Sequence, residues 1–234
     1  MFRKVAIIDP LGAHGSSHHF YIFGQSYGLK YNNVNVSIYT NSETQNPNID
    51  GVRFYQTFGH LFSNKLPIFI AIRYIIGAIK SVFHARFRGV SVFHFHIFYN
   101  NVLVLFSCLI VKLLFGKLVL TVHDVDSFAN GNRFMLKSSL LYKFSDLILT
   151  HNQFSKDEII KLATDVKDKI HIIPHGNYIP FIKISEDKEK SREYLALPSD
   201  KTILLFFGMI KKVKGLDVLL ESFKKVVAEN SDVV

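Results

Sequence analysis

Short apolar runs alternate along the chain with longer segments in which apolar residues recur at helical spacing. Strands are predicted at residues 4–9, 34–39, 52–55, 90–95, 117–122, 146–150 and 169–173. Helices are predicted at 18–30, 68–88, 102–115, 133–144 and 156–163, the last with a capping box formed by Ser155 and Glu158. Continuously apolar strands that alternate with helices are typical of a parallel sheet covered on both faces. The pattern predicts an α/β fold with a Rossmann-like parallel sheet.

The pattern changes near residue 181 and then begins again. Residues 181–190 are polar and charged, and 191–197 are expected to form a short helix. An apolar run at 203–207 then stops at Gly208, and a helical repeat runs from Leu216 to Phe223. We therefore predict a first domain over 1–180, a linker over 181–200, and an incomplete second Rossmann-like domain over 201–234.

The turn of this strand, turn and helix carries Lys211, Lys212 and Lys214, with Gly215 directly before the helix. A helix N-terminus has free N–H groups and a positive dipole end, so ammonium groups beside it favour a phosphate or diphosphate. On spacing alone, lysines that are merely solvated are the more common explanation of such a turn.

The stretch F-F-G-M-I-K-K-V-K-G-L-D-V-L-L-E-S-F resembles the segment that opens the second domain of family 4 glycosyltransferases, GT-B enzymes that use nucleotide-diphosphate sugars. Gly208, Lys214 and Gly215 fall on the family's positions. Met209 stands where many members have arginine, and Lys211 follows two residues later. The resemblance implies that Gly208, Lys211 and Lys214 bind the donor diphosphate.

Other motifs extend the resemblance along the chain. T-V-H-D, after the predicted strand 117–122, is similar to a family motif whose histidine reaches the donor sugar, which makes His123 the candidate catalytic residue. Gly15 and Ser16 match the family's first loop, which lets substrates approach the backbone. Residues 169–177 resemble the end of the family's first domain. Members also carry a downstream pair of glutamates, so the resemblance implies a truncated chain that is inactive alone.

Charge is concentrated in the first half of the chain. Residues 1–120 hold 11 Lys and Arg against 3 Asp and Glu, a net charge of +8 out of +9 overall. Such a surface attracts anionic membranes or acidic acceptors, and no nucleic-acid motif is present. Residues 68–88 mix basic and aromatic residues, which suits either a core helix or a membrane-surface helix.

The chain contains a single cysteine, Cys108, and starts without a secretory signal pattern. The apolar segment 102–115 is too short to span a bilayer. We expect a cytoplasmic protein, with peripheral attachment to the inner face of the cell membrane as an option.

Histidines give weaker signals. His94 and His96 have alternating strand spacing and should share a face, but no Cys, Asp or Glu lies nearby to complete a metal site. We therefore expect no metal and no cofactor. His14 and His18 are more typical of loop or cap residues than of ligands.

Together these observations favour a retaining glycosyltransferase that moves a sugar from a nucleotide sugar to a glycan or lipid-linked acceptor in cell-surface polysaccharide or glycolipid synthesis. The alternatives are a nucleotide-sugar epimerase of the same architecture and a non-catalytic module that docks an acceptor or a membrane.

Overall fold

The computed structural model describes residues 4–14, 18–63, 66–98, 101–123, 125, 135–181, 187–208 and 210–234. The chain divides into two compact units, residues 1–182 and 183–234, and each is described by itself. The first unit contains the sheet and the second contains the lysine-bearing turn.

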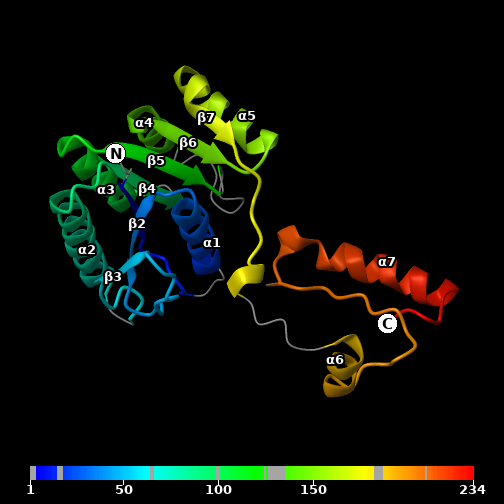
Figure 1. The fold of residues 1–234 in the computed structure, drawn as a ribbon. Coiled ribbons are helices and arrows are strands. Elements are labelled where there is room, and N and C mark those ends of the chain that lie inside the picture. The colour runs from blue at the N-terminus through cyan, green and yellow to red at the C-terminus, as the bar shows by residue number, and fades with distance from the viewer. Residues whose placement is uncertain are drawn as a thin grey trace. The chain divides into compact units, whose positions relative to one another are not determined.

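The first unit is built on a seven-stranded sheet with the order β3-β2-β1-β4-β5-β6-β7 (Figure 1). All neighbouring strands are parallel, which confirms the predicted Rossmann-like sheet. The strands are β1 Lys4–Asp9, β2 Asn35–Asn41, β3 Arg53–Phe58, β4 Val92–Ile97, β5 Lys117–Val122, β6 Leu147–Thr150 and β7 Ile170–Ile172. The strand order reverses between β1 and β4, and ligands of open α/β sheets bind at such a switch point.

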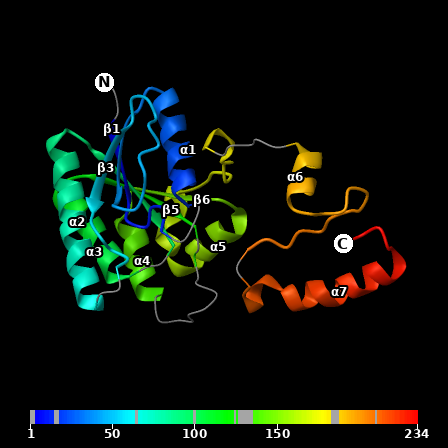
Figure 2. The same cartoon turned by 90° about the horizontal axis from the view of Figure 1, so that it is seen from below.

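Helices lie on both faces of this sheet, with α1 on one face and α2 to α5 on the other (Figures 1 and 2). Their bounds are α1 His18–Tyr31, α2 Pro67–Phe87, α3 Val102–Leu113, α4 Met135–Phe144 and α5 Gln153–Leu162, followed by the 3-10 helices η2 Thr164–Lys169 and η3 Ile179–Phe181. Right-handed crossovers explain the division, because the chain runs one way from β1 to β3 and the other way from β4 to β7.

The two faces have separate cores. A small cluster under α1 includes Ile7, Ile22 and Ile38, whereas a larger one on the other face includes Phe93 and Leu118. α1 packs mainly against β2. The α1 face of β4, β5 and β6 is therefore less covered than the opposite face.

The α5 helix begins differently from the prediction. Asn152 is its N-cap, and the Asn152 side chain accepts a hydrogen bond of 2.8 Å from the backbone N–H of Ser155. The predicted Ser155–Glu158 capping box is wrong, because Asn152 takes the cap position three residues earlier and places Ser155 inside the first turn. Asn101 caps α3 in the same way, because its side chain accepts hydrogen bonds from the N–H groups of Leu103 and Val104.

The second unit comprises α6 Lys188–Tyr194, the 3-10 helix η4 Lys212–Lys214 and α7 Leu216–Glu229. The predicted helix at 191–197 thus starts and ends earlier. The predicted strand at 203–207 is wrong, because the structure has only an isolated parallel bridge between Thr202 and Val233 there. A strand requires a ladder of partners, and here the pairing extends only to Leu204, whose N–H donates to Val234 O at 2.8 Å.

Candidate functional site

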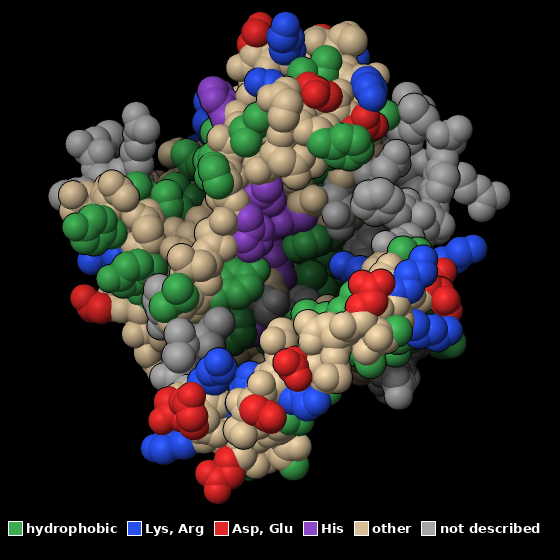
Figure 3. Space-filling model, turned by 90° about the vertical axis from the view of Figure 1, so that its right-hand side faces the viewer, with side chains coloured by type: hydrophobic (Ala, Val, Ile, Leu, Met, Phe, Trp, Pro, Cys, Tyr) green, Lys and Arg blue, Asp and Glu red, His purple; other side chains and the backbone are tan. Residues whose placement is uncertain are grey.

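Consecutive strands each carry a histidine to the carboxyl edge of the sheet. His96 lies at the end of β4, His123 and His151 directly follow β5 and β6, and His175 follows β7 by three residues. Since the strands are parallel and in register, these side chains meet at one edge. Histidine side chains gather in a central patch on the face shown in Figure 3, and a further histidine lies apart from it. His18, His94, His96, His123 and His151 are called the histidine cluster below.

Short contacts between ring nitrogens join the cluster into a chain of imidazoles. His96 Nδ1 lies 3.0 Å from His123 Nε2, and His123 Nδ1 lies 3.2 Å from His151 Nε2. His151 Nδ1 donates to the backbone carbonyl of Ile173 at 2.9 Å. The structure thus places the predicted catalytic residue His123 at the expected edge, but with both ring nitrogens engaged. A substrate could bind either nitrogen only by replacing a neighbouring histidine.

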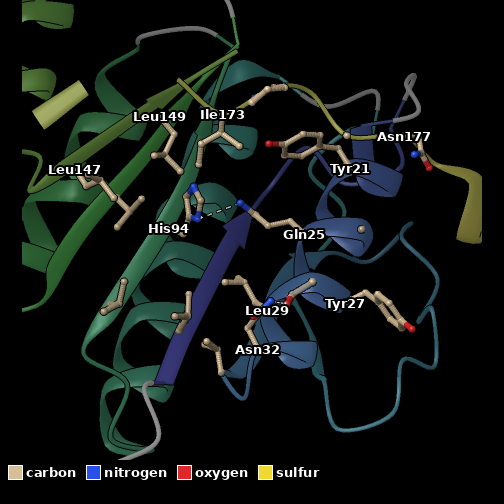
Figure 4. Close-up of a pocket in the computed structure, with 18 residues that line it drawn as sticks. Tyr21, Gln25, Tyr27, Leu29, Asn32, His94, Leu147, Leu149, Ile173 and Asn177 are labelled. Atoms are coloured by element: carbon tan, nitrogen blue, oxygen red, sulfur yellow. Dashed lines mark hydrogen bonds between the residues drawn. The ribbon is translucent and has the colours of Figure 1, made fainter. Parts of the chain in front are cut away.

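Helix α1 supplies the other wall of the site. The Tyr21 ring packs against His96, His123, His151 and His175, with centroid separations of 4.8 to 5.4 Å. The Gln25 amide connects two histidines, with Oε1 3.0 Å from His96 Nε2 and Nε2 3.4 Å from His94 Nδ1. The second of these contacts is dashed in Figure 4.

His94 completes this network on strand β4. The His94 and His96 rings stack with centroids 4.8 Å apart, which confirms that they share a face. His94 Nε2 also lies 2.8 Å from Thr121 Oγ1 on β5. The network therefore runs from Thr121 through Gln25 to His151 and links β4, β5, β6 and α1.

The environment of the cluster keeps its imidazoles neutral. Burial lowers the pKa of His94 to about 4. Burial, together with the charge of His19 and His175, lowers the pKa of His18 to about 3. For His96 and His123, burial and then neighbouring histidines hold the pKa well below the usual value. Near neutral pH these rings are weak bases, suited to hydrogen bonding or metal ligation.

A buried carboxyl lies beside the cluster at the end of β1. Asp9 Oδ1 accepts a hydrogen bond from the Gly12 N–H at 3.2 Å and lies 3.9 Å from His18 Nε2. Burial raises the pKa of Asp9 to about 6, because the backbone hydrogen bonds offset only part of the desolvation. Gly12 has φ 51° and lies where a Cβ would approach Thr44 Oγ1 within 1.9 Å, so this loop requires glycine.

Other predicted residues of the first loop have different outcomes. Gly15 and Ser16 lie outside the described residues, so their predicted role stays a prediction. His14 Nδ1 lies 3.1 Å from Glu43 Oε2, and the His14 ring stacks on Phe62. His14 therefore anchors the loop, whereas His18 belongs to the cluster.

A pocket of about 660 Å³ adjoins the cluster on the α1 face of the sheet. Figure 4 shows Leu147, Leu149 and Ile173 on its apolar side, with Gln25 and His94 facing them. The pocket occupies the part of the sheet that α1 leaves uncovered. Gln25 and His94 thus take part in both the pocket and the histidine network.

The second unit contains the lysine turn, residues 208–215. Gly208 and Gly215 have φ angles of 133° and 63°, which favour glycine, and Gly215 is the N-cap of α7. The N–H of Lys214 donates to Lys211 O at 2.9 Å, and the side chains of Lys211, Lys212 and Lys214 are exposed. The helix begins at Leu216 as the sequence predicts, and the binding roles of Gly208, Lys211 and Lys214 stay predictions.

One group of residues in the described part of the chain could hold a metal ion. His18, His96 and His123 each offer a ring nitrogen, and these nitrogens lie within 4.8 Å of one another. His18 comes from α1, His96 from β4, and His123 from the end of β5. The sequence places no Cys, Asp or Glu near His96 in the chain to complete a metal site. The fold instead brings His18 and His123 to His96 from other elements.

Sequence reasoning missed Asp9, Tyr21, Gln25, Thr121 and His151. A signal for His151 was present, because it follows its strand just as His123 follows β5. Gln25 and Tyr21 had none, since a polar residue and an aromatic residue on a helix are ordinary. Their importance arises from the face of α1 that meets the strand ends.

A family model described as Glycosyltransferase Family 4 matches residues 20–177. Two curated relatives are D-inositol 3-phosphate glycosyltransferases, from Xylanimonas cellulosilytica and Catenulispora acidiphila. The first is 27% identical over 90 residues, covering 36% of this chain and 22% of the relative. The second is 24% identical over 88 residues, covering 38% of this chain and 21% of the relative.

Solved structures share the fold. A sucrose-phosphate synthase from Thermosynechococcus elongatus matches with a TM-score of 0.67 at 14% identity, over 96% of this chain and 60% of that one. Anabaena HepE in complex with UDP and glucose matches with a TM-score of 0.64 at 15% identity, over 99% of this chain and 60% of that one. A UDP-N-acetylglucosamine 2-epimerase from Rickettsia bellii matches with a TM-score of 0.57 at 11% identity, over 100% of this chain and 61% of that one. The chain thus spans about three fifths of these structures and about a fifth of the curated relatives.

Proposed function

The chain belongs to glycosyltransferase family 4, and from this premise we propose that it takes part in transferring a sugar, with retention of anomeric configuration, from a nucleotide-diphosphate sugar to a glycan or lipid-linked acceptor. The observation that carries the proposal is the family match over residues 20–177, which includes the whole carboxyl edge from His94 to His175. The proposed setting is cell-surface polysaccharide or glycolipid synthesis in the cytoplasm.

Each candidate residue has a proposed role. Lys211 and Lys214 bind the donor diphosphate together with the N-terminus of α7, and Gly208 lets the backbone approach it. His123 contacts the sugar, and Gly15 with Ser16 lines the substrate loop. Preorganised positive charge at a leaving diphosphate is usually a large catalytic contribution, so this reaction requires no metal or cofactor.

Nucleotide binding is the first test. Calorimetry on the 234-residue chain should show UDP or another nucleoside diphosphate binding more tightly than the matching nucleoside, because the diphosphate carries the recognised charge. Equal affinities would contradict the proposal. A non-catalytic docking module would bind neither compound.

Product analysis is the second test. We expect no measurable transfer by this chain alone, because Val233 is the only described residue of the second unit that is buried. The assay is a panel of nucleotide sugars with a membrane extract as acceptor, and turnover would refute the predicted inactivity.

The epimerase alternative is favoured by the fold shared with the Rickettsia bellii enzyme. Incubation of nucleotide sugars without acceptor separates the two functions, since an epimerase changes the donor itself. Any epimerised donor would favour that alternative over glycosyl transfer.

Membrane docking is a further part of the proposal, and α2 supports it. Among the described residues it is the one helix long and apolar enough to cross a bilayer, although a helix packed against a sheet can meet the same criteria. Residues such as Ala78 and Val82 face the core, while the opposite face exposes Ile68, Ile72, Ile76, Phe83 and Phe87. Lys80 and Arg88 are also exposed, so we propose that this face binds an anionic membrane surface.

Vesicle sedimentation tests this docking. The chain should bind anionic vesicles more than neutral ones, and binding should weaken as salt screens the exposed charges. The double variant Ile72→Ser/Phe83→Ser should lose binding, whereas Leu220→Ser on exposed α7 is the control. Equal binding to both vesicle types at low salt would refute the proposal.

A further inference from the structure

With the Gln25 amide oriented as in the structure, the hydrogen bonds of the histidine cluster assign the protons to particular ring nitrogens. At one end, the Ile173 carbonyl can only accept, so His151 Nδ1 carries a hydrogen. A neutral His151 then presents a lone pair at Nε2 and accepts from His123 Nδ1. A neutral His123 is left with a lone pair at Nε2.

The other end of the network imposes a second constraint. Gln25 Oε1 accepts from His96 Nε2, and Gln25 Nε2 donates to His94 Nδ1. Neutral His94 then donates from Nε2 to Thr121 Oγ1. A neutral His96 is left with a lone pair at Nδ1.

The two remaining lone pairs face each other. His96 Nδ1 and His123 Nε2 are 3.0 Å apart, a distance at which two neutral acceptors need a cation between them. A divalent metal ion binds neutral imidazoles directly and satisfies both lone pairs.

We propose that His18, His96 and His123 form a binding site for a divalent ion of the Zn²⁺ class, with His96 Nδ1 and His123 Nε2 as two of the ligands. Three imidazoles suit Zn²⁺, Co²⁺, Ni²⁺ or Cu²⁺ and not Mg²⁺ or Ca²⁺, which prefer oxygen ligands. The metal site shares His123 with the proposed sugar contact, and its tests measure metal binding alone and not glycosyl transfer. It departs from the expectation of no metal, which considered only residues near His94 and His96 in the chain.

The geometry is close to that of a bound site. Tetrahedral coordination with bonds of about 2.1 Å separates ligand nitrogens by roughly 3.4 Å. The His96–His123 pair, at 3.0 Å, must open by about 0.4 Å, and His18, within 4.8 Å, must move inward by up to about 1.4 Å.

Outer partners of the proposed ligands are already present. Gln25 Oε1 accepts from His96 Nε2, and His151 Nε2 accepts from His123 Nδ1. These are the ring nitrogens of His96 and His123 that do not bind the proposed metal ion. Metal-ligating histidines almost always make such a bond, which sets the ring orientation. The buried Asp9 carboxyl, 3.9 Å from His18 Nε2, places a compensating negative charge beside the site.

Metal titration of the chelator-treated 234-residue chain tests the proposal. Zn²⁺ competition with a chromogenic chelator should show one ion per chain, and Co²⁺ should give the visible spectrum of a tetrahedral site. His96→Ala should weaken Zn²⁺ binding more than the roughly 10- to 100-fold that loss of an outer partner costs. His171→Ala is the matched control, because His171 is an exposed histidine on β7.

A second variant covers the case in which His96→Ala fails to fold by circular dichroism. Gln25→Met keeps all three histidines and removes only the outer acceptor of His96, so affinity should fall about 10- to 100-fold. In the Zn²⁺ complex, imidazole ¹⁵N spectra should show His96 protonated at Nε2 and His123 at Nδ1.

Three results would overturn the site. The first is no Zn²⁺ binding by the wild-type chain. The second is that His171→Ala and His96→Ala weaken Zn²⁺ binding equally, which indicates that scattered surface histidines bind the ion. The third is a His96 Nδ1–H tautomer that persists in Zn²⁺. That tautomer corresponds to Gln25 with its amide reversed, an arrangement in which every ring is neutral and no lone pairs face each other.

Discussion

The histidine cluster and the lysine turn are built in opposite ways. The cluster draws side chains from α1, β4, β5 and β6, and its members are buried or half-buried. The lysine turn lies within eight consecutive residues, and Lys211, Lys212 and Lys214 are exposed. The cluster therefore depends on the whole sheet, whereas the turn depends on local backbone geometry.

This difference affects chemistry as well as construction. Removal from water makes the cluster's rings neutral and fixes their hydrogen bonds, so its chemistry arises from packing. The lysines are exposed to solvent and act through electrostatic attraction, which salt screens. Damage to the sheet should thus disturb the cluster, and only changes in the turn itself should disturb the lysines.

The largest expected effect separates the two units. Phe93 is fully buried on β4, the strand that carries His94 and His96, and Phe93→Ala should cost about 3–5 kcal/mol of unfolding free energy. Leu220→Ala on α7, where the side chain is 52% exposed, should stay within about 0.5 kcal/mol. Urea denaturation followed by circular dichroism measures both. Comparable losses would show that α7 is buried in solution.

The next effect concerns the lysine turn. Lys214→Ala should remove one charge-assisted contact to a nucleoside diphosphate, of order 1.5–3 kcal/mol, or roughly ten- to more than a hundredfold in affinity. Lys211→Ala should act in the same direction. Calorimetry at matched salt measures the affinities.

Lys212 provides the internal control for this experiment. It has the same charge and exposure as its neighbours but no assigned contact, so Lys212→Ala should cost little beyond a screened surface contribution. If Lys212→Ala weakens binding as much as Lys214→Ala, the turn is a diffuse basic patch.

The smallest effect is a pH dependence at the other end of the sheet. Asp146 accepts from Leu118 N–H at 2.8 Å and pairs with Lys112 and Lys117 at 2.8 and 3.0 Å. Burial alone would raise its pKa, but these partners hold the pKa below the ordinary 3.8. The stabilisation is therefore present above about pH 4 and is lost as the pH falls through the lowered folded-state pKa.

Asp146→Asn should cost about 1 kcal/mol at pH 7, a modest value because solvent reaches the pair. The urea midpoints of wild type and variant should converge below about pH 4. Asp165→Asn is the comparison, since Asp165 is 58% exposed and lies 3.4 Å from Lys143, and should cost less. A difference that persists at low pH would exclude the carboxylate as its source.

Individual elements show where sequence reasoning succeeds. β1 and β5 have the predicted bounds, because each is a continuously apolar run that a central parallel strand requires. The segment 203–207 has an equally apolar pattern yet forms no strand, since pairing needs a neighbour that no local pattern supplies. Asn152 replaced Ser155 as the α5 cap because two suitable residues competed within one turn.

The sequence alone determined the alternation of strands and helices, the parallel Rossmann-like sheet, the positive turn before α7, and the place of His123 after β5. These features follow from local periodicity and residue type, which each segment carries by itself. Only the tertiary structure decided that His18, His96, His123 and His151 meet, that Gln25 joins His96 to His94, and that Asp9 lies beside them. Strand order and helix packing set those contacts, because residues distant in the chain become neighbours only when the sheet assembles.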